Sequence, residues 1–312
     1  VQVGDAAKED PVAEAHLGKD GEEKLSDIDY TDAFACLDTK TDLSLLAVPG
    51  VPKVGEQAML DLGMEYCRSR SLQDVFFIGE MEDDITPDGA IAFRNNLTSP
   101  NSYGAIYFPW LNAQDPSGRS SEPINLPPSG YIAGLYARID ASRGVWKAPA
   151  GTEATLSRTV GVAADLTDVE QGNLNRINVN CIRRFPAAGI VSWGSRTITS
   201  DPEYQYIPVR RTAIMLRKSI YEGIQWAVFE PNDESLWSQL RLNIGSFMMT
   251  LFRRGAFQGS TPSQAFFVKC DSETNPQEEI DLGIVTVLVG FAPLKPAEFV
   301  VVKISQKAGQ AS

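Results

Sequence analysis

The sequence predicts a mixed α/β protein: a βαβ-type N-terminal part, then a C-terminal domain of two long helices packed on a small sheet. A strand, a helix and a strand follow one another within residues 43–80, which is the arrangement of a parallel βαβ unit. Two apolar stripes at helical spacing then occupy residues 209–251, and three β-like segments follow them.

The composition is that of an ordinary globular protein. The chain has 312 residues, 43% of them hydrophobic and 22% charged. Its formal net charge of −12 opposes nonspecific binding to nucleic acid. The longest apolar run, residues 284–293, is about half as long as a bilayer span. We therefore predict neither a nucleic-acid partner nor membrane insertion.

Residues 1–29 are acidic and lack alternating apolar positions, so we expect a polar, mobile N-terminal segment there. Residues 30–200 are expected to form an α/β core with surface loops, whose elements follow from apolar runs and helical periodicity. In chain order they are a strand at 43–50, a helix at 56–70, a strand at 74–80, a helix at 90–97, a strand at 103–111, helices at 129–143 and 166–174, and strands at 178–185 and 189–197. Ser129 is expected to cap the helix that it begins.

Residues 201–296 are predicted to form the C-terminal domain. Its first helix, 209–229, is stopped by Pro231. Asn232 is expected to cap the second helix, which ends at Gly255. Segments 265–270 and 284–291 are expected to be strands of the sheet that packs on these helices.

Residues 297–312 contain an apolar strand close to the end of the chain. Because side chains alternate across a strand, both of its faces are expected to be mostly buried. An apolar edge without a partner promotes association with another chain. The segment is either an inner strand of this chain's own sheet or a strand donated to a neighbouring copy. The residues of this candidate inter-subunit strand are Ala297, Glu298, Phe299, Val300, Val301, Val302, Lys303 and Ile304.

Motifs of catalysis and cofactor binding are missing from the sequence. It has no glycine-rich nucleotide loop and no GxSxG or HExxH motif. The single histidine, His16, excludes the usual Ser-His and Cys-His schemes. We therefore expect no enzyme activity, no cofactor and no metal. The alternative is an enzyme that uses carboxylates of residues 80–88, Asp83 and Asp84 among them.

The four cysteines are too widely spaced to supply a zinc ligand set. They are Cys36, Cys67, Cys181 and Cys270. Apolar neighbours around Cys36 and Cys270 favour buried free thiols, and the alternative is a disulfide between distant cysteines.

The order of several longer motifs resembles the tail sheath proteins of contractile phages and of related contractile injection systems. The similarity extends from about residue 30 to the end of the chain. It includes NSYGAIYFPWL (101–111), PPSGYIAGLYARIDASRGVWKAPAG (127–151), LNRINVNCIRRFPAAGIVSWGSRT (174–197), YIPVRRT (206–212), QWAVFEPNDESLW (225–237), RGAFQGSTPSQAFFVKCD (254–271) and GFAPLKPAEFVVVKI (290–304).

The resemblance implies a structural subunit that polymerises helically as hexameric rings around an inner tube and contracts to drive the tube through a target cell envelope. It implies other copies of the protein, the inner tail tube protein, and the baseplate and tail terminator proteins as partners. The implied location is the virion tail or a phage-tail-like particle, assembled in the bacterial cytoplasm. The alternative is a static structural or baseplate relative. Because residues 1–29 do not show the family's N-terminal pairing arm, we expect that arm to lie upstream or to be missing.

The resemblance also implies that the C-terminal domain faces the tube through electrostatic contacts. We expect an acidic tube or an acidic neighbouring subunit to meet basic residues among Arg210, Arg211, Arg217, Lys218, Arg253 and Arg254. The alternative for each of them is a solvated or salt-bridged helix surface. For Arg253 and Arg254, a further alternative is that their positive charges complement the negative end of a helix dipole.

Overall fold

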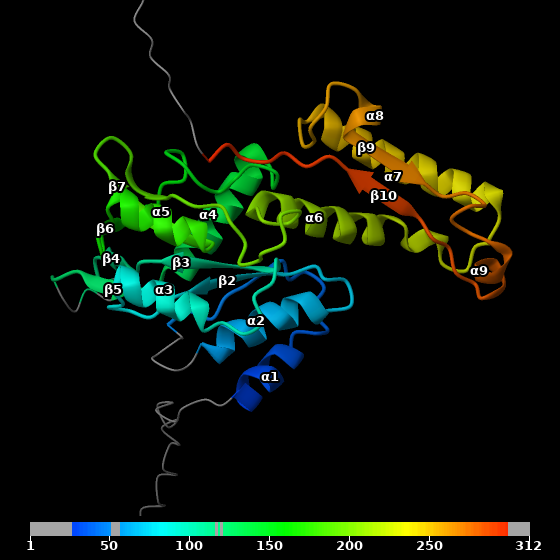
Figure 1. Ribbon diagram of the computed structural model, residues 1–312. Coiled ribbons are helices and arrows are strands. Elements are labelled where there is room, and N and C mark those ends of the chain that lie inside the picture. Colours follow the sequence, from blue (N-terminus) through cyan, green and yellow to red (C-terminus); the bar gives the residue numbers. More distant parts are fainter. Residues whose placement is uncertain (1–26, 51–56, 116–117, 119–120, 299–312) are drawn as a thin grey trace, which may run out of the picture.

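The computed structural model describes residues 27–50, 57–115, 118 and 121–298. Figure 1 shows a central region built on a β-sheet and, beside it, a C-terminal lobe that runs from helix α7 to strand β10. Helix α6 connects the two parts, and the chain after β10 returns from the lobe across α6 to the central region. The expected mixed α/β class is confirmed.

The central sheet has the strand order β1-β2-β3-β7-β8. Its strands are β1 (Leu45–Leu46), β2 (Phe76–Glu80), β3 (Gly104–Phe108), β7 (Val179–Phe185) and β8 (Gly189–Ser192). The first four run parallel, and β8 pairs antiparallel with β7. Since α2 (Ala58–Ser69) connects the parallel pair β1 and β2, the predicted βαβ unit is confirmed.

Helices cover both faces of this sheet. They are α1 (Asp27–Ala35), α2, α3 (Pro87–Asn95), α4 (Pro128–Arg143) and α5 (Asp168–Arg176). In Figure 1, α1 lies below α2, and the strands lie between α2 and α4. Every residue of β2 and β3 is buried. This agrees with their continuous apolar runs, which are typical of strands covered on both faces.

The expected bounds of two strands and one expected helix cap were wrong in the central region. The strand predicted at 189–197 ends at Ser192. The strand predicted at 103–111 ends at Phe108, and the chain after Pro109 enters a separate antiparallel sheet of order β5-β4-β6. The strands of that sheet are β4 (Leu111–Ala113), β5 (Ile124–Leu126) and β6 (Thr159–Val162). Ser129 does not cap α4, because the helix begins at Pro128 with Pro127 as its N-cap and Ser129 lies inside the first turn. Its backbone N–H donates to Glu80 on β2.

The two long helices and the strand pair of the C-terminal part are confirmed, but the first helix, predicted at 209–229, ends at Gly223 instead of near Pro231. The elements are α6 (Ile207–Gly223), the 3₁₀ turn η1 (Gln225–Ala227), α7 (Glu234–Arg253), α8 (Pro262–Ala265), β9 (Phe266–Lys269), α9 (Gln277–Asp281) and β10 (Leu288–Phe291). Strands β9 and β10 pair antiparallel. The cap of α7 is Asp233, which accepts from two backbone N–H groups. The predicted cap Asn232 instead accepts from the Trp237 indole at 2.8 Å.

The hydrophobic core divides within α6. Ile207 and Ile214, in its first turns, pack into the large cluster of the central region. Leu216 packs with α7 and the segment before β9 in the lobe. Because one helix contributes to both clusters, α6 fixes the lobe to the central region.

Cys67, Cys181 and Cys270 are buried free thiols, whereas Cys36 is exposed, so its expected burial was wrong. Burial raises the pKa of the Cys67 and Cys181 thiols. Within the described ranges, every helix is too short or too polar to cross a lipid bilayer.

Candidate functional site

Two of the carboxylates considered for catalysis, Glu80 and Asp83, accept hydrogen bonds from other segments of the chain. Glu80 is 1% exposed. It accepts from the Gly50 N–H at 2.6 Å and from the Ser129 N–H at 2.9 Å. Burial raises the pKa of this carboxyl. Asp83 accepts from the Asn125 amide at 3.0 Å. Among the described residues, no group of His, Cys, Asp and Glu side chains could hold a metal ion.

Arg210 and Arg211 lie in the buried first turns of α6, each with 8% exposure. The Arg210 guanidinium carbon lies 3.5 Å from the centre of the Tyr204 ring, and Nη2 donates to Ser102 Oγ at 2.5 Å. Arg211 donates two hydrogen bonds to the Asp140 carboxylate, at 2.9 and 2.6 Å. These two residues join α6 to the central region.

Arg217 and Lys218 contact the central region one turn or more further along α6. Arg217 donates to the Gln73 side chain. Lys218 Nζ donates to the Leu43 carbonyl at 3.1 Å and lies 3.8 Å from the Asp74 carboxylate. The structure therefore gives all four basic residues of α6 partners within the chain.

Arg253 and Arg254 lie at the C-terminal end of α7, where both are exposed. The Arg254 guanidinium carbon lies 5.3 Å from the centre of the Trp146 ring, which belongs to the loop after α4. Of the six basic residues selected from the sequence, Arg217, Arg253 and Arg254 are exposed. Arg217 donates to Gln73 of the central region, whereas Arg253 and Arg254 lie at the end of α7.

The chain after β10 crosses from the lobe back to the central region (Figure 1). At the lobe, the Ala292 N–H donates to the Ala265 carbonyl at 2.8 Å, and Pro293 forms a bridge with Phe257. At the central region, Glu298 pairs with Arg196 at 2.5 Å. The segment between these two attachments, residues 294–297, spans the space between the two regions.

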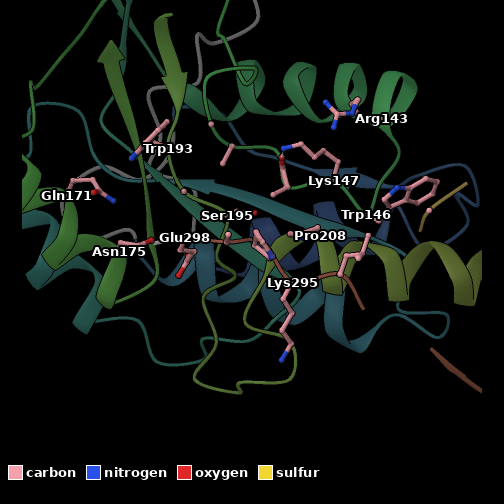
Figure 2. Close-up of a pocket in the computed structure, with 18 of the residues that line it drawn as sticks. Arg143, Trp146, Lys147, Gln171, Asn175, Trp193, Ser195, Pro208, Lys295 and Glu298 are labelled. Atoms are coloured by element: carbon pink, nitrogen blue, oxygen red, sulfur yellow. Dashed lines mark hydrogen bonds between the residues drawn. The ribbon is translucent and has the colours of Figure 1, made fainter. Parts of the chain in front are cut away.

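A cleft of about 700 Å³ opens beside this crossing segment. Figure 2 shows Arg143, Trp146 and Lys147 on one side of the cleft, with Asn175 and Glu298 on the other. Sequence reasoning found no signal for Arg196 or for this cleft, because Arg196 and Glu298 are 102 residues apart in the chain.

Most of the candidate inter-subunit strand, residues 299–304, lies outside the described residues. Ala297 and Glu298 are described and belong to no assigned strand. Ala297 is exposed, and Glu298 is held by its own chain.

Comparison with protein families matches nearly the whole chain to two domains of one family. Residues 23–198 match the phage tail sheath protein central domain, and residues 199–307 match the phage tail sheath C-terminal domain. The tail sheath protein of Vibrio phage KVP40 is 27% identical over 218 residues, which cover 69% of this chain and 31% of the phage protein. The curated relatives are longer proteins, of which the matched part spans 31–53%.

Solved structures of contractile assemblies share the fold. A chain of the anti-feeding prophage baseplate superposes with a TM-score of 0.78 at 30% identity, covering 92% of this chain and 75% of that one. A chain of the PVC sheath complex, an extracellular contractile injection system in its contracted state, gives 0.77 at 32% identity, covering 89% and 75%. The chain therefore belongs to the phage tail sheath protein family, of which it carries the central and the C-terminal domains.

Proposed function

We propose that this protein is the structural subunit of a contractile tail sheath, which polymerises helically as hexameric rings around an inner tube and contracts to drive the tube through a target cell envelope. The observation that carries the proposal is the agreement in fold, over 89% of the chain, with a sheath complex solved in its contracted state. Its partners are other copies of itself, the inner tube protein, and the baseplate and tail terminator proteins. Its location is the tail of a phage or phage-like particle, assembled in the bacterial cytoplasm.

Strand addition between copies would link the subunits. Among the described residues, β9 and β10 pair only with each other, so each has an edge free to accept a further strand. Phe267 on β9 is 54% exposed and Leu288 on β10 is 51% exposed, which leaves apolar surface for an added strand to cover. The proposed donor is the segment 299–304 of a neighbouring copy, the part of the candidate inter-subunit strand that follows Glu298. Such head-to-tail contacts generate helical arrays when they do not close into a ring.

Electron microscopy of the full chain, expressed with an inner tube protein encoded beside it, tests the proposal. We expect tubes with axial striations in two forms, one long and narrow and the other short and wide. A static baseplate relative would give a single form of particle. Monomers at all concentrations, or closed shells, would contradict the proposed function.

Arg253 and Arg254 are the proposed tube-facing or neighbour-facing basic residues, because they are exposed at the end of α7. Reversing both charges, with Arg253→Glu and Arg254→Glu, is expected to weaken co-sedimentation of sheath with tube by about tenfold, and more strongly at low salt. The matched control is Arg68→Glu on the exposed face of α2, which we expect to leave co-sedimentation unchanged. Unchanged co-sedimentation of the double variant would remove these two residues from the tube interface.

A further inference from the structure

Arg196 lies where the last described residues of the chain meet the central region. Its Nε donates to Glu298 Oε1 at 2.8 Å and its Nη2 to Oε2 at 2.5 Å. The two side chains are 12% and 13% exposed. Two parallel hydrogen bonds between a guanidinium and a carboxylate fix their relative orientation as well as their separation. Glu298 therefore has one defined position on the central region.

The backbone of Arg196 is itself tied to the central sheet. Asn180, a fully buried residue of β7, accepts from the Arg196 N–H at 2.7 Å and donates to the Arg196 carbonyl at 2.7 Å. Gly194 permits this close approach, because a Cβ atom there would lie 2.7 Å from the Asn180 Cα. Arg196 is thus a rigid attachment point, and its position is set by the sheet.

The crossing segment depends on this attachment. In the described part of the chain, no backbone hydrogen bond joins residues 294–297 to the rest of the protein. Leu294, Lys295 and Ala297 are exposed. Beyond the bridge at Pro293, the end of the segment is therefore fixed through Glu298, which pairs with Arg196 and also interacts with the Tyr206 side chain.

We propose that Arg196 is the positioning residue of the C-terminal arm, defined here as residues 299–312. By holding Glu298, Arg196 fixes the point from which the arm leaves the subunit, and with it the direction in which the arm reaches a neighbouring copy. This inference rests on the proposed function, because only an arm that links neighbours requires a fixed point of departure.

Chain geometry explains why a fixed departure point matters. The candidate strand, residues 299–304, spans at most about 20 Å when fully extended, so its acceptor lies close to Glu298. Without the pair, the unattached part of the chain would begin at residue 294. The position of residue 298 relative to the subunit would then vary by roughly a further 15 Å. A tether with a less defined origin lowers the effective concentration of the arm at its acceptor.

Charge reversal and charge exchange test the inference. Glu298→Arg and Arg196→Glu are each expected to raise the protein concentration at which half of the sheath assembles by at least about tenfold. The exchanged double variant, Arg196→Glu with Glu298→Arg, should restore that concentration to within about threefold of the wild type. Glu298→Gln leaves Arg196 and its contacts to the sheet intact, and should also raise the concentration. Sedimentation and electron microscopy give the readout.

The matched control is the same exchange at Glu65 and Arg68, a pair on α2 whose side chains are 41% and 52% exposed. We expect it to leave assembly unchanged. Single variants that assemble as the wild type does, or an exchanged variant that fails to recover, would overturn the inference.

Thermal unfolding of dispersed protein separates this inference from the proposed function. A double-mutant cycle below the assembly concentration should show coupling between Arg196 and Glu298, and zero coupling would overturn the inference. Wild-type assembly is measured first. Its failure would refute the proposed function and, with it, the positioning role, even where the cycle shows coupling.

Discussion

Replacing Asp140 by alanine is expected to lower the free energy of unfolding by about 2–4 kcal/mol, because it leaves the Arg211 guanidinium buried without its counter-charge. Arg211 is 8% exposed and donates two hydrogen bonds to Asp140. The estimate lies somewhat below that for a fully buried pair, because the Asp140 side chain is 24% exposed. Urea unfolding of the dispersed protein measures the loss.

The ion pair of Arg143 with Glu153 provides a matched control. Arg143 belongs to α4, as Asp140 does, but the side chains of Arg143 and Glu153 are 50% and 60% exposed. Glu153→Ala should change the free energy of unfolding by less than about 1 kcal/mol. Replacing both members of the buried pair, with Asp140→Ala and Arg211→Met, should cost less than Asp140→Ala alone, because no unpaired charge remains. A loss equal to that of Glu153→Ala would show that the pair does not attach α6 to the central region.

The elements that the sequence predicted well are those in which local pattern and burial agree. Of the stripe predicted for the second long helix, Leu236, Leu240, Ile244 and Leu251 are buried. Side chains at helical spacing lie on one face of the helix, whatever that face packs against. The buried face of this helix can therefore be predicted from the sequence without knowledge of the fold. The parallel strands β2 and β3 could also be predicted from the sequence, because a strand that is buried on both faces requires a continuous apolar run.

The basic residues of α6 show what such patterns do not predict, namely which charged side chains are buried and which partners they contact. Arg210 and Arg211 belong to a helix with an apolar stripe, and a charged residue beside such a stripe is ordinarily solvated. Here, however, the first turns of α6 are buried among α4, the Tyr204 ring and the segment before β3. The partners that neutralise or stack on these guanidinium groups, Asp140 and Tyr204 among them, are identified only by the fold.

The contact between Arg196 and Glu298 could not be predicted from the sequence for the same reason. Glu298 lies 102 residues further along the chain, at the edge of an apolar run with a β-strand pattern. Nothing local distinguishes it from a solvated glutamate. Only the return of the chain from the lobe brings its carboxylate to Arg196.

Val302→Pro is expected to abolish sheath assembly at concentrations where the wild type assembles fully. Val302 lies in the candidate inter-subunit strand, outside the described residues. Proline lacks the backbone N–H that a strand donates to its neighbour, and its ring disfavours the central positions of a sheet. Since strand addition is held mainly by backbone hydrogen bonds, one missing donor in so short a segment weakens every link of the array. Sedimentation and negative-stain electron microscopy measure the loss.

Two comparisons decide whether this strand pairs between copies or within one chain. Ala308→Pro, placed beyond the apolar run 299–304, is expected to leave assembly unchanged, which would limit the effect to the strand itself. For a strand donated to a neighbour, Val302→Pro should leave the unfolding of dispersed protein within about 0.5 kcal/mol of the wild type, because the dispersed subunit does not use that strand. For an inner strand of the chain's own sheet, the same variant would destabilise the dispersed protein by several times that amount. Destabilised monomers would therefore refute strand donation, and stable monomers that cannot assemble would support it.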